Sequence, residues 1–276
     1  MNQASEKQKR KETHFPAGRM VKAMEFRNEL IASAAAQLAR DYCCAPEDFL
    51  KKENKVTLAR SADGQRRFKQ EPDFFRAATM GAGTVVSASS EMLDFARELL
   101  AGSSGPEVFE QKNIWALNRV MAQYNKAVGA SSIYYLPQSS YKYIPSNKIR
   151  IRIFEEEEII SELYPIKGFN NALLYSSEGP RRDKLAAAAI NGVKIVGIAG
   201  ASSDSPIMWQ IGVDVLSGYR GMGIGSELVS ALTQAVFMHG AVPYYGTWNG
   251  NIASQNTAIR ANYRPAWAEM FSFDIE

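Results

Sequence analysis

The chain has few residues that could bind zinc or form disulfides. Its 276 residues include two cysteines, Cys43 and Cys44, and two histidines, His14 and His239. Adjacent cysteines make a poor structural cross-link, so we expect a protein of a reducing compartment, the cytoplasm. The histidines are far apart in sequence and no cysteine spacing typical of zinc is present, so we expect no metal site.

Long apolar runs and a strong net charge are missing as well. No uninterrupted stretch of about 18 apolar residues occurs, which predicts no membrane span. A net charge of +3 gives no reason to expect a nucleic-acid partner. The basic N-terminus lacks the apolar segment that a secretory signal needs. We expect residues 1–22 to form a flexible tail; an arm that binds nucleic acid or a membrane surface is the alternative.

The most informative stretch runs from residue 207 to 230. The apolar run Ile207 to Leu216 has the length and β-branched content of a buried strand. After Arg220, glycine occupies three alternate positions, Gly221, Gly223 and Gly225. From Ile224 to Val236 apolar residues recur at about one-turn spacing, which predicts a helix that begins directly after the turn.

A strand, a glycine turn and a helix in this order form an anion-binding arrangement. The first turn of a helix leaves about four N–H groups without partners and carries roughly half a positive charge. Glycines remove the side chains that would hold a phosphate away, and Arg220 can add a charge-assisted contact. Nucleotide sites of three kinds are disfavoured, because neither GxxxxGK nor GxGxxG occurs here and a kinase glycine loop would lie earlier in a longer domain.

The rest of the chain reads as two halves of mixed helix and strand. A hydrophobic content of 46% and a charged content of 22% indicate a folded globular protein. In the first half the patterns predict a helix at 24–42, strands at 54–61 and 74–88, and helices at 90–100 and 114–128. In the second half they predict strands at 148–154, 183–190, 193–201, 207–216 and 242–248, helices at 223–238 and 251–261, and a terminal strand pair at 267–273.

A segment rich in proline, serine and tyrosine, 133–148, separates these halves. We place the domain boundary there, which predicts an N-terminal α/β domain at 23–140 and a second domain at 148–276. The tyrosines of this segment would either line a substrate pocket or cover the seam between domains. In the second half, Asn191 and Gly192 form the dipeptide most typical of a tight hairpin turn.

One motif in the second half resembles a known family. The segment YRGMGIGSELV, Tyr219 to Val229, resembles the acyl-CoA pyrophosphate motif of the GNAT superfamily of N-acetyltransferases. Arg220, Gly223 and Gly225 match the motif's arginine and two glycine positions. IGVDVLSGYRG resembles the family's fourth strand and its turn, and WNGNIASQNTAIRANYRP resembles the segment after the fifth strand. The three segments follow one another in the family's order.

This resemblance implies a fold and an acyl donor. It implies a mixed α/β fold of the GNAT type in the second half, preceded by a smaller mixed α/β domain. The fourth and fifth strands would splay apart and admit the pantetheine arm of acetyl-CoA. Main-chain groups from Val213 to Val215 would bind that arm, and Asn251 would contact it from the other wall. The pyrophosphate would be held by the turn residues Arg220, Gly221, Met222, Gly223, Ile224 and Gly225.

The positions that handle protons in many family members differ in this chain. A tyrosine that protonates the leaving thiolate would fall at Ala258, and a glutamate base on the fourth strand would fall at Ile211. Asp214 is the one acid of that strand, and we expect either a solvent or loop contact or a role beside the amine. Tyr245 on the fifth strand is a candidate acid or else a core tyrosine. Asp214 and Tyr245 are therefore the candidate catalytic residues.

The resemblance predicts an acyl-CoA-dependent N-acyltransferase that transfers acetyl to an amine of a small molecule or peptide. A thioester is already activated, so aligning a neutral amine against it supplies much of the rate. The first alternative is a non-catalytic acyl-CoA-binding regulatory protein, a hypothesis motivated by Ala258 and Ile211. The second is a scaffold whose cofactor site has decayed, which predicts no binding at all.

Overall fold

The computed structural model describes residues 17–66, 72–139, 143–146, 149–179 and 181–275. The α-helices in this part of the chain are α1 (Ala17–Asp41), α2 (Leu93–Ala101), α3 (Gln111–Met121), α4 (Glu156–Glu158), α5 (Ile224–Met238) and α6 (Ile252–Arg260). The strands are β1 (Lys55–Leu58), β2 (Phe75–Thr79), β3 (Thr84–Ala88), β4 (Lys126–Val128), β5 (Ser132–Pro137), β6 (Arg150–Glu155), β7 (Asp183–Asn191), β8 (Lys194–Ser203), β9 (Met208–Val215), β10 (Val242–Trp248) and β11 (Tyr263–Asp274).

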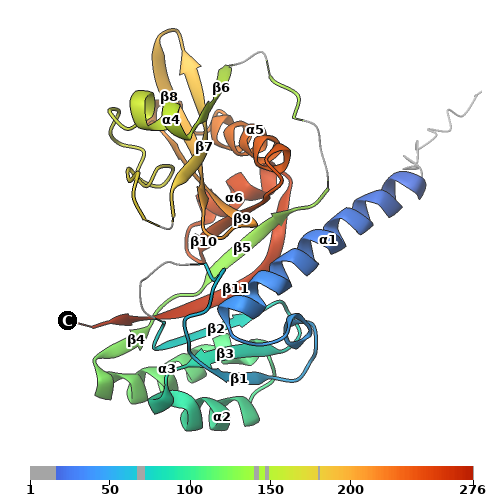
Figure 1. The fold of residues 1–276 in the computed structure, drawn as a ribbon, viewed down its shortest axis with the longest axis vertical. Coiled ribbons are helices and arrows are strands. Elements are labelled where there is room, and N and C mark those ends of the chain that lie inside the picture. Colours follow the sequence, from blue (N-terminus) through green and yellow to red (C-terminus); the bar gives the residue numbers. More distant parts are fainter. Residues whose placement is uncertain (1–16, 67–71, 140–142, 147–148, 180, 276) are drawn as a thin grey trace, which may run out of the picture.

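These strands form one mixed sheet. Its order is β1-β3-β2-β11-β5-β10-β9-β8-β7-β6, and β4 pairs with β11 beside this path. The pairs β1–β3 and β9–β10 are parallel, and the others are antiparallel. Figure 1 shows β11 extending from the part of the molecule that contains α5 and α6 to the part that contains α2 and α3. The predicted mixed α/β fold is confirmed.

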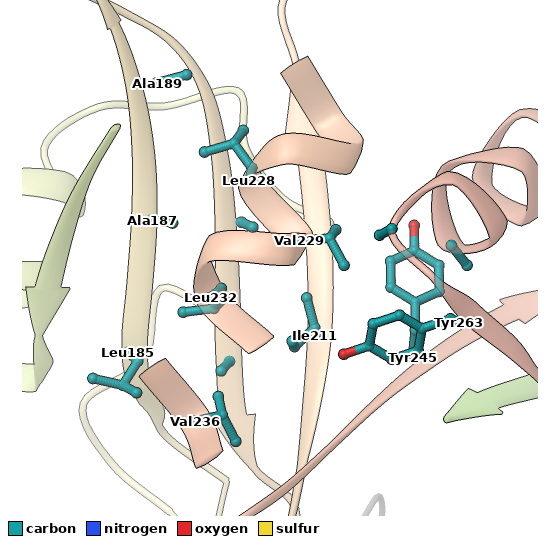
Figure 2. Close-up of a cluster of buried hydrophobic side chains, with 14 of the residues drawn as sticks. Leu185, Ala187, Ala189, Ile211, Leu228, Val229, Leu232, Val236, Tyr245 and Tyr263 are labelled. Atoms are coloured by element: carbon teal, nitrogen blue, oxygen red, sulfur yellow. The ribbon is translucent and has the colours of Figure 1, made fainter. Parts of the chain in front are cut away.

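The helix α5 covers one face of the sheet. Its residues Leu228 and Leu232 pack with Leu185 and Ala187 of β7 and with Ile211 of β9 (Figure 2). The helical spacing of the apolar residues from Ile224 to Val236 therefore reflects a buried stripe, as the sequence predicts.

The opposite face is covered by α1 and by the segment before β7. Alternate residues of a strand point to opposite faces, and on β5 Tyr135 belongs to the core under α5 while Tyr134 packs with Leu38 of α1. Phe169 and Leu173 cover the same face farther along, where they pack on alternate residues of β7 and β8. Between α1 and this segment the face carries the polar side chains that line the cleft described below.

Most predicted elements are present, but several differ in extent. The helix α1 begins at Ala17, so residues 17–22 of the expected tail are helical, while residues 1–16, His14 among them, lie outside the described residues. The predicted strand at 74–88 is a hairpin of two strands, β2 and β3. The predicted helix at 114–128 ends at Met121, and its last residues form β4. The expected terminal strand pair is a single strand, β11, with an irregularity between Pro265 and Trp267.

The segment expected to separate two domains contributes a strand to the middle of the sheet. Strand β5 pairs with β10 along one edge and with β11 along the other. Consequently the first half of the chain supplies a central strand to the sheet of the second half. The division into domains at 23–140 and 148–276 stays a prediction.

A buried group of charged and aromatic side chains lies between α1, β5 and β11, and we call it the Arg66 cluster. The guanidinium of Arg66 contacts Asp41 (Nε to Oδ2, 2.5 Å) and Glu269 (Nη2 to Oε1, 2.9 Å), and all three side chains are buried. Glu269 also accepts hydrogen bonds from Tyr42 (3.0 Å) and from Trp267 (2.9 Å). Each carboxylate of the cluster therefore has protein partners.

Candidate functional site

The parallel strands β9 and β10 pair along half their length and then part. Their register runs from Val242 opposite Met208 to Tyr245 opposite Ile211. Beyond that point β10 continues only with β5, and β9 continues only with β8. The two facing edges leave their N–H and C=O groups open to a bound extended molecule, because backbone groups of a strand are obligatory hydrogen-bonding groups.

A cleft of about 850 Å³ occupies the space between the parted strands. Its walls come from β9, the glycine turn, α5, β10 and α6. The lining includes the sequence-predicted site residues Val213, Asp214, Val215, Arg220, Gly221, Gly223, Ile224, Gly225, Tyr245 and Asn251. Met222 is the predicted residue that does not line the cleft, and its side chain is 62% exposed to solvent.

The glycine turn presents backbone amides to the cleft. Gly223 is the N-cap of α5 and has φ +83°, a left-handed conformation that glycine adopts without strain. A Cβ atom built on Gly223 would meet no other atom within 4 Å, so its missing side chain leaves open space at the helix N-terminus. The first-turn N–H groups that follow have no partner within the helix. Arg220 donates from Nε to the carbonyl oxygen of Val215 (2.9 Å), which holds its guanidinium beside the turn.

Helix α6 forms the opposite wall. Asn251 is its N-cap and accepts a hydrogen bond from the N–H of Ser254 (3.1 Å). Asn251 Nδ2 has no hydrogen-bond partner among the described residues, so this amide can donate into the cleft. Thr257 and Arg260 line the cleft from the same helix, and Arg260 brings a second positive charge to the cleft in addition to Arg220. Thr257 and Arg260 are three positions apart, and this spacing places two side chains on the same face of a helix. The spacing was therefore visible in the sequence, although neither residue was predicted to belong to the site.

Asp214 holds a loop in place. Its carboxylate accepts hydrogen bonds from Asn171 N (2.7 Å), Asn171 Nδ2 (2.7 Å) and Ala172 N (3.1 Å). The loop lies directly on the sheet, because a Cβ built on Gly212 would come within 1.9 Å of the Asn171 carbonyl oxygen, and one on Gly200 within 1.9 Å of the Ala172 carbonyl oxygen. Of the two expectations for Asp214, the loop contact is the one present.

The comparison with protein-family models bears on the second half of the chain. Residues 149–263 match the family model described as the acetyltransferase (GNAT) family. These residues form a GNAT acetyltransferase family domain. The predicted GNAT fold of the second half is thereby confirmed, and the residues before 149 are an additional N-terminal region.

Among the solved structures that the chain matches are three described as acetyltransferases. The GCN5-related N-acetyltransferase from Kribbella flavida has a TM-score of 0.47 and 11% identity, covering 88% of this chain and 95% of that one. A putative GNAT-family acetyltransferase from Novosphingobium aromaticivorans has a TM-score of 0.42 and 14% identity, and the match covers 55% of this chain and 68% of that one. The GCN5-related N-acetyltransferase from Sphaerobacter thermophilus has a TM-score of 0.42 and 15% identity, and the match covers 57% of this chain and 56% of that one. The comparison with curated proteins gave no match.

In this GNAT domain the two positions that handle protons in many family members carry buried aliphatic side chains, and Ile211 also lines the cleft. Ala258 and Ile211 are both buried in the cluster under α5 and α6. Tyr245 belongs to the same cluster, near Tyr263 in Figure 2, and its hydroxyl hydrogen-bonds to Ser254 Oγ at 2.7 Å. Burial raises the pKa of Tyr245 above the ordinary value of a phenol, so the hydroxyl keeps its proton at neutral pH. Tyr245 is thus both a core tyrosine and a protonated group on the cleft wall.

Three further observations concern described residues outside the cleft. His239 at the end of α5 contacts the carbonyl oxygen of Ala235 through Nδ1 (2.9 Å), as expected for a residue at a helix C-terminus. In the part of the chain that the structure describes, no three His, Cys, Asp or Glu side chains lie close enough together to hold a metal ion. None of the described helices has the length and apolar character to cross a membrane.

Proposed function

We propose that this protein is an acyl-CoA-dependent N-acyltransferase that transfers acetyl from acetyl-CoA to an amine. The observation that carries the proposal is the parting of β9 and β10 beside a glycine turn and the N-terminus of α5. GNAT proteins typically use acetyl-CoA, and an elongated donor with phosphates at one end suits a cleft with open strand edges and a helix N-terminus. The cysteine content fits a cytoplasmic enzyme.

The residues of the cleft divide into main-chain and side-chain contacts. Val213 and Val215 would offer main-chain groups to the pantetheine, and the amides from Gly221 to Gly225 would bind the pyrophosphate. Asn251 would donate from Nδ2 across the gap. Arg220 and Arg260, which have no carboxylate partner among the described residues, would add positive charge near the phosphates.

The reaction depends mainly on the alignment of the amine with the thioester. The thioester supplies an activated acetyl group, and the protein's part is to hold a neutral amine against it and to provide an N–H for the developing oxyanion. Tyr245, protonated and bonded to Ser254, is the group on the cleft wall best placed to give a proton to the departing thiolate. Asp214 acts as a positioning residue, because its oxygens already hold the loop at Asn171.

Binding is tested by thermal unfolding with and without acetyl-CoA. Ligand at about 100 times its Kd stabilises a protein by roughly 2.7 kcal/mol, so acetyl-CoA should raise the Tm of the wild type. Gly223→Glu places a carboxylate where the phosphates would lie and should abolish the rise. Gly240→Glu is the matched control, since Gly240 has φ +75° with open space around it at the other end of α5. It should keep the rise, and the absence of a Tm shift with any acyl-CoA would refute the proposal.

A second candidate function is a non-catalytic acyl-CoA-binding regulatory protein. The buried Ala258 and Ile211 favour it, because neither position can exchange a proton. Release of the free CoA thiol, measured over a panel of amines, separates the two functions. Amine-dependent release supports the transferase, whereas a Tm shift without release on any amine supports the regulatory protein.

A further inference from the structure

Side chains from both faces of the sheet line the cleft, and the two sides differ in composition. Strand residues alternate between faces, so Gln210 and Tyr134 lie on the face opposite Ile211 and Tyr135, which pack under α5. The glycine turn and α6 stand on the α5 side, where the acyl donor is proposed to bind. The other side, between α1 and the loop at Asn171, is left for the acceptor.

Two polar side chains meet over Gly246 on this acceptor side. A Cβ built on Gly246 would lie 2.7 Å from Cε1 of Tyr134 and 3.0 Å from Nε2 of Gln210, so the glycine makes room for both side chains. The Tyr244 hydroxyl donates its proton to Asp204, and Gln210 Oε1 lies 3.3 Å from the same hydroxyl, while Gln210 Nε2 has no partner among the described residues. This amide is therefore a hydrogen-bonding group that lines the cleft.

Aromatic rings form the rest of the acceptor side. The ring of Tyr134 is stacked on Trp267, with centroids 4.9 Å apart and planes 5° from parallel, so its position is fixed. Trp248 lies against Gly250, where an added Cβ would come within 2.0 Å of Cζ3 of the indole. The indole is still 55% exposed, which leaves a ring available to a ligand.

No free carboxylate faces this space among the described residues. Asp214 is the one acid that lines the cleft, and both of its oxygens hold the loop at Asn171. The charged groups behind this wall are Arg66, which is paired with Asp41 and Glu269, and Asp204, which is paired with Arg181 and accepts a hydrogen bond from Tyr244. An acceptor with several positive charges would lose water on entry and find no counter-charge.

We infer that the acceptor is a primary monoamine with an uncharged aromatic body, bound on the face opposite α5 by Gln210, Tyr134 and Trp248. This inference rests on the proposed function. It excludes polyamines and lysine-rich peptides as preferred acceptors, because their recognition requires carboxylates.

The test compares free-thiol release from acetyl-CoA with 2-phenylethylamine and with spermidine. For the wild type we expect kcat/KM to be at least about tenfold higher for 2-phenylethylamine. Gln210→Glu adds a carboxylate at the acceptor side and should change this ratio by about tenfold towards spermidine. Gln111→Glu, the same substitution at an exposed position on α3, is the matched control and should leave the ratio unchanged.

The possible outcomes of this experiment bear on different parts of the two proposals. Equal or better turnover of spermidine by the wild type overturns the inference and leaves the transferase proposal standing. An unchanged ratio in Gln210→Glu overturns the placement of the acceptor at Gln210. Absence of release with every amine overturns the transferase proposal, and the inference with it.

Discussion

The Arg66 cluster and the cleft lie on neighbouring strands of one sheet, yet their polar groups find partners in different places. In the cluster, Asp41 and Glu269 receive hydrogen bonds from Arg66, Tyr42 and Trp267. In the cleft, the amides at the start of α5 and the side-chain amides of Gln210 and Asn251 face open space. Polar groups paired within the protein fix a structure, whereas those left unpaired on a concave surface can bind a ligand.

The largest expected effect comes from breaking the cluster. Arg66→Ala leaves two buried carboxylates without their cation and should lower the free energy of unfolding by about 3–5 kcal/mol. Urea unfolding monitored by circular dichroism measures it. Arg97→Ala, which removes an exposed ion pair with Asp94, is the control and should cost less than about 1 kcal/mol. A similarly small loss for Arg66→Ala would show that the cluster is not a stabilising unit.

A smaller effect is the loss of stability at high pH. Burial raises the pKa of Tyr42 and of Tyr244, with Glu269 and Asp204 respectively as the next cause. Above a pH of about 10 an unfolded tyrosine loses its proton while these two keep theirs, so stability should fall as pH rises, by up to about 1.4 kcal/mol per pH unit for each group. Below that pH both states are protonated and no slope arises from them.

Unfolding free energies measured between pH 8 and pH 11 check this sign. Tyr244→Phe should flatten the decline, and Tyr124→Phe, which removes a partly exposed hydroxyl, serves as the matched control. A decline of equal steepness in the wild type and in Tyr244→Phe would contradict the role of the buried phenol.

The smallest effect on stability is expected at the cleft wall. Arg260→Gln should change the free energy of unfolding by no more than about 0.5 kcal/mol, because Arg260 is exposed. It should weaken acetyl-CoA binding by about twofold to tenfold, with a larger difference at low salt. Calorimetric titration with acetyl-CoA at two ionic strengths measures the affinity and its salt dependence, and urea unfolding measures the stability. Arg119→Gln on α3 is the control. Unchanged affinity at both salt concentrations would remove Arg260 from the binding site.

Local patterns predicted the elements that build the cleft. The β9 strand, the glycine turn and α5 follow one another in sequence, so periodicity and glycine spacing were sufficient to predict them. The hairpin between β7 and β8 was also predicted, but its turn lies one residue later than expected, at Gly192 and Val193, because Asn191 still pairs with Lys194. These parts depend on contacts between residues close in sequence.

Contacts between distant residues could not be predicted in this way. Arg66 lies 203 residues before Glu269, and no pattern in one sequence pairs them. The contact of Asp214 with Asn171 spans 43 residues, so the sequence could not show which loop this acid holds. Strand β5 looked like a linker because its composition is that of an exposed segment, but its partners β10 and β11 bury it.

The central place of β5 has a consequence for how the molecule melts. Its six residues precede the GNAT domain in sequence, yet β10 and β11 both depend on them for pairing. A fragment that starts at residue 149 would expose a bare strand edge on β10, the kind of edge through which chains aggregate. The part of the chain before residue 149 and the GNAT domain should therefore unfold together, as one cooperative transition in a calorimeter.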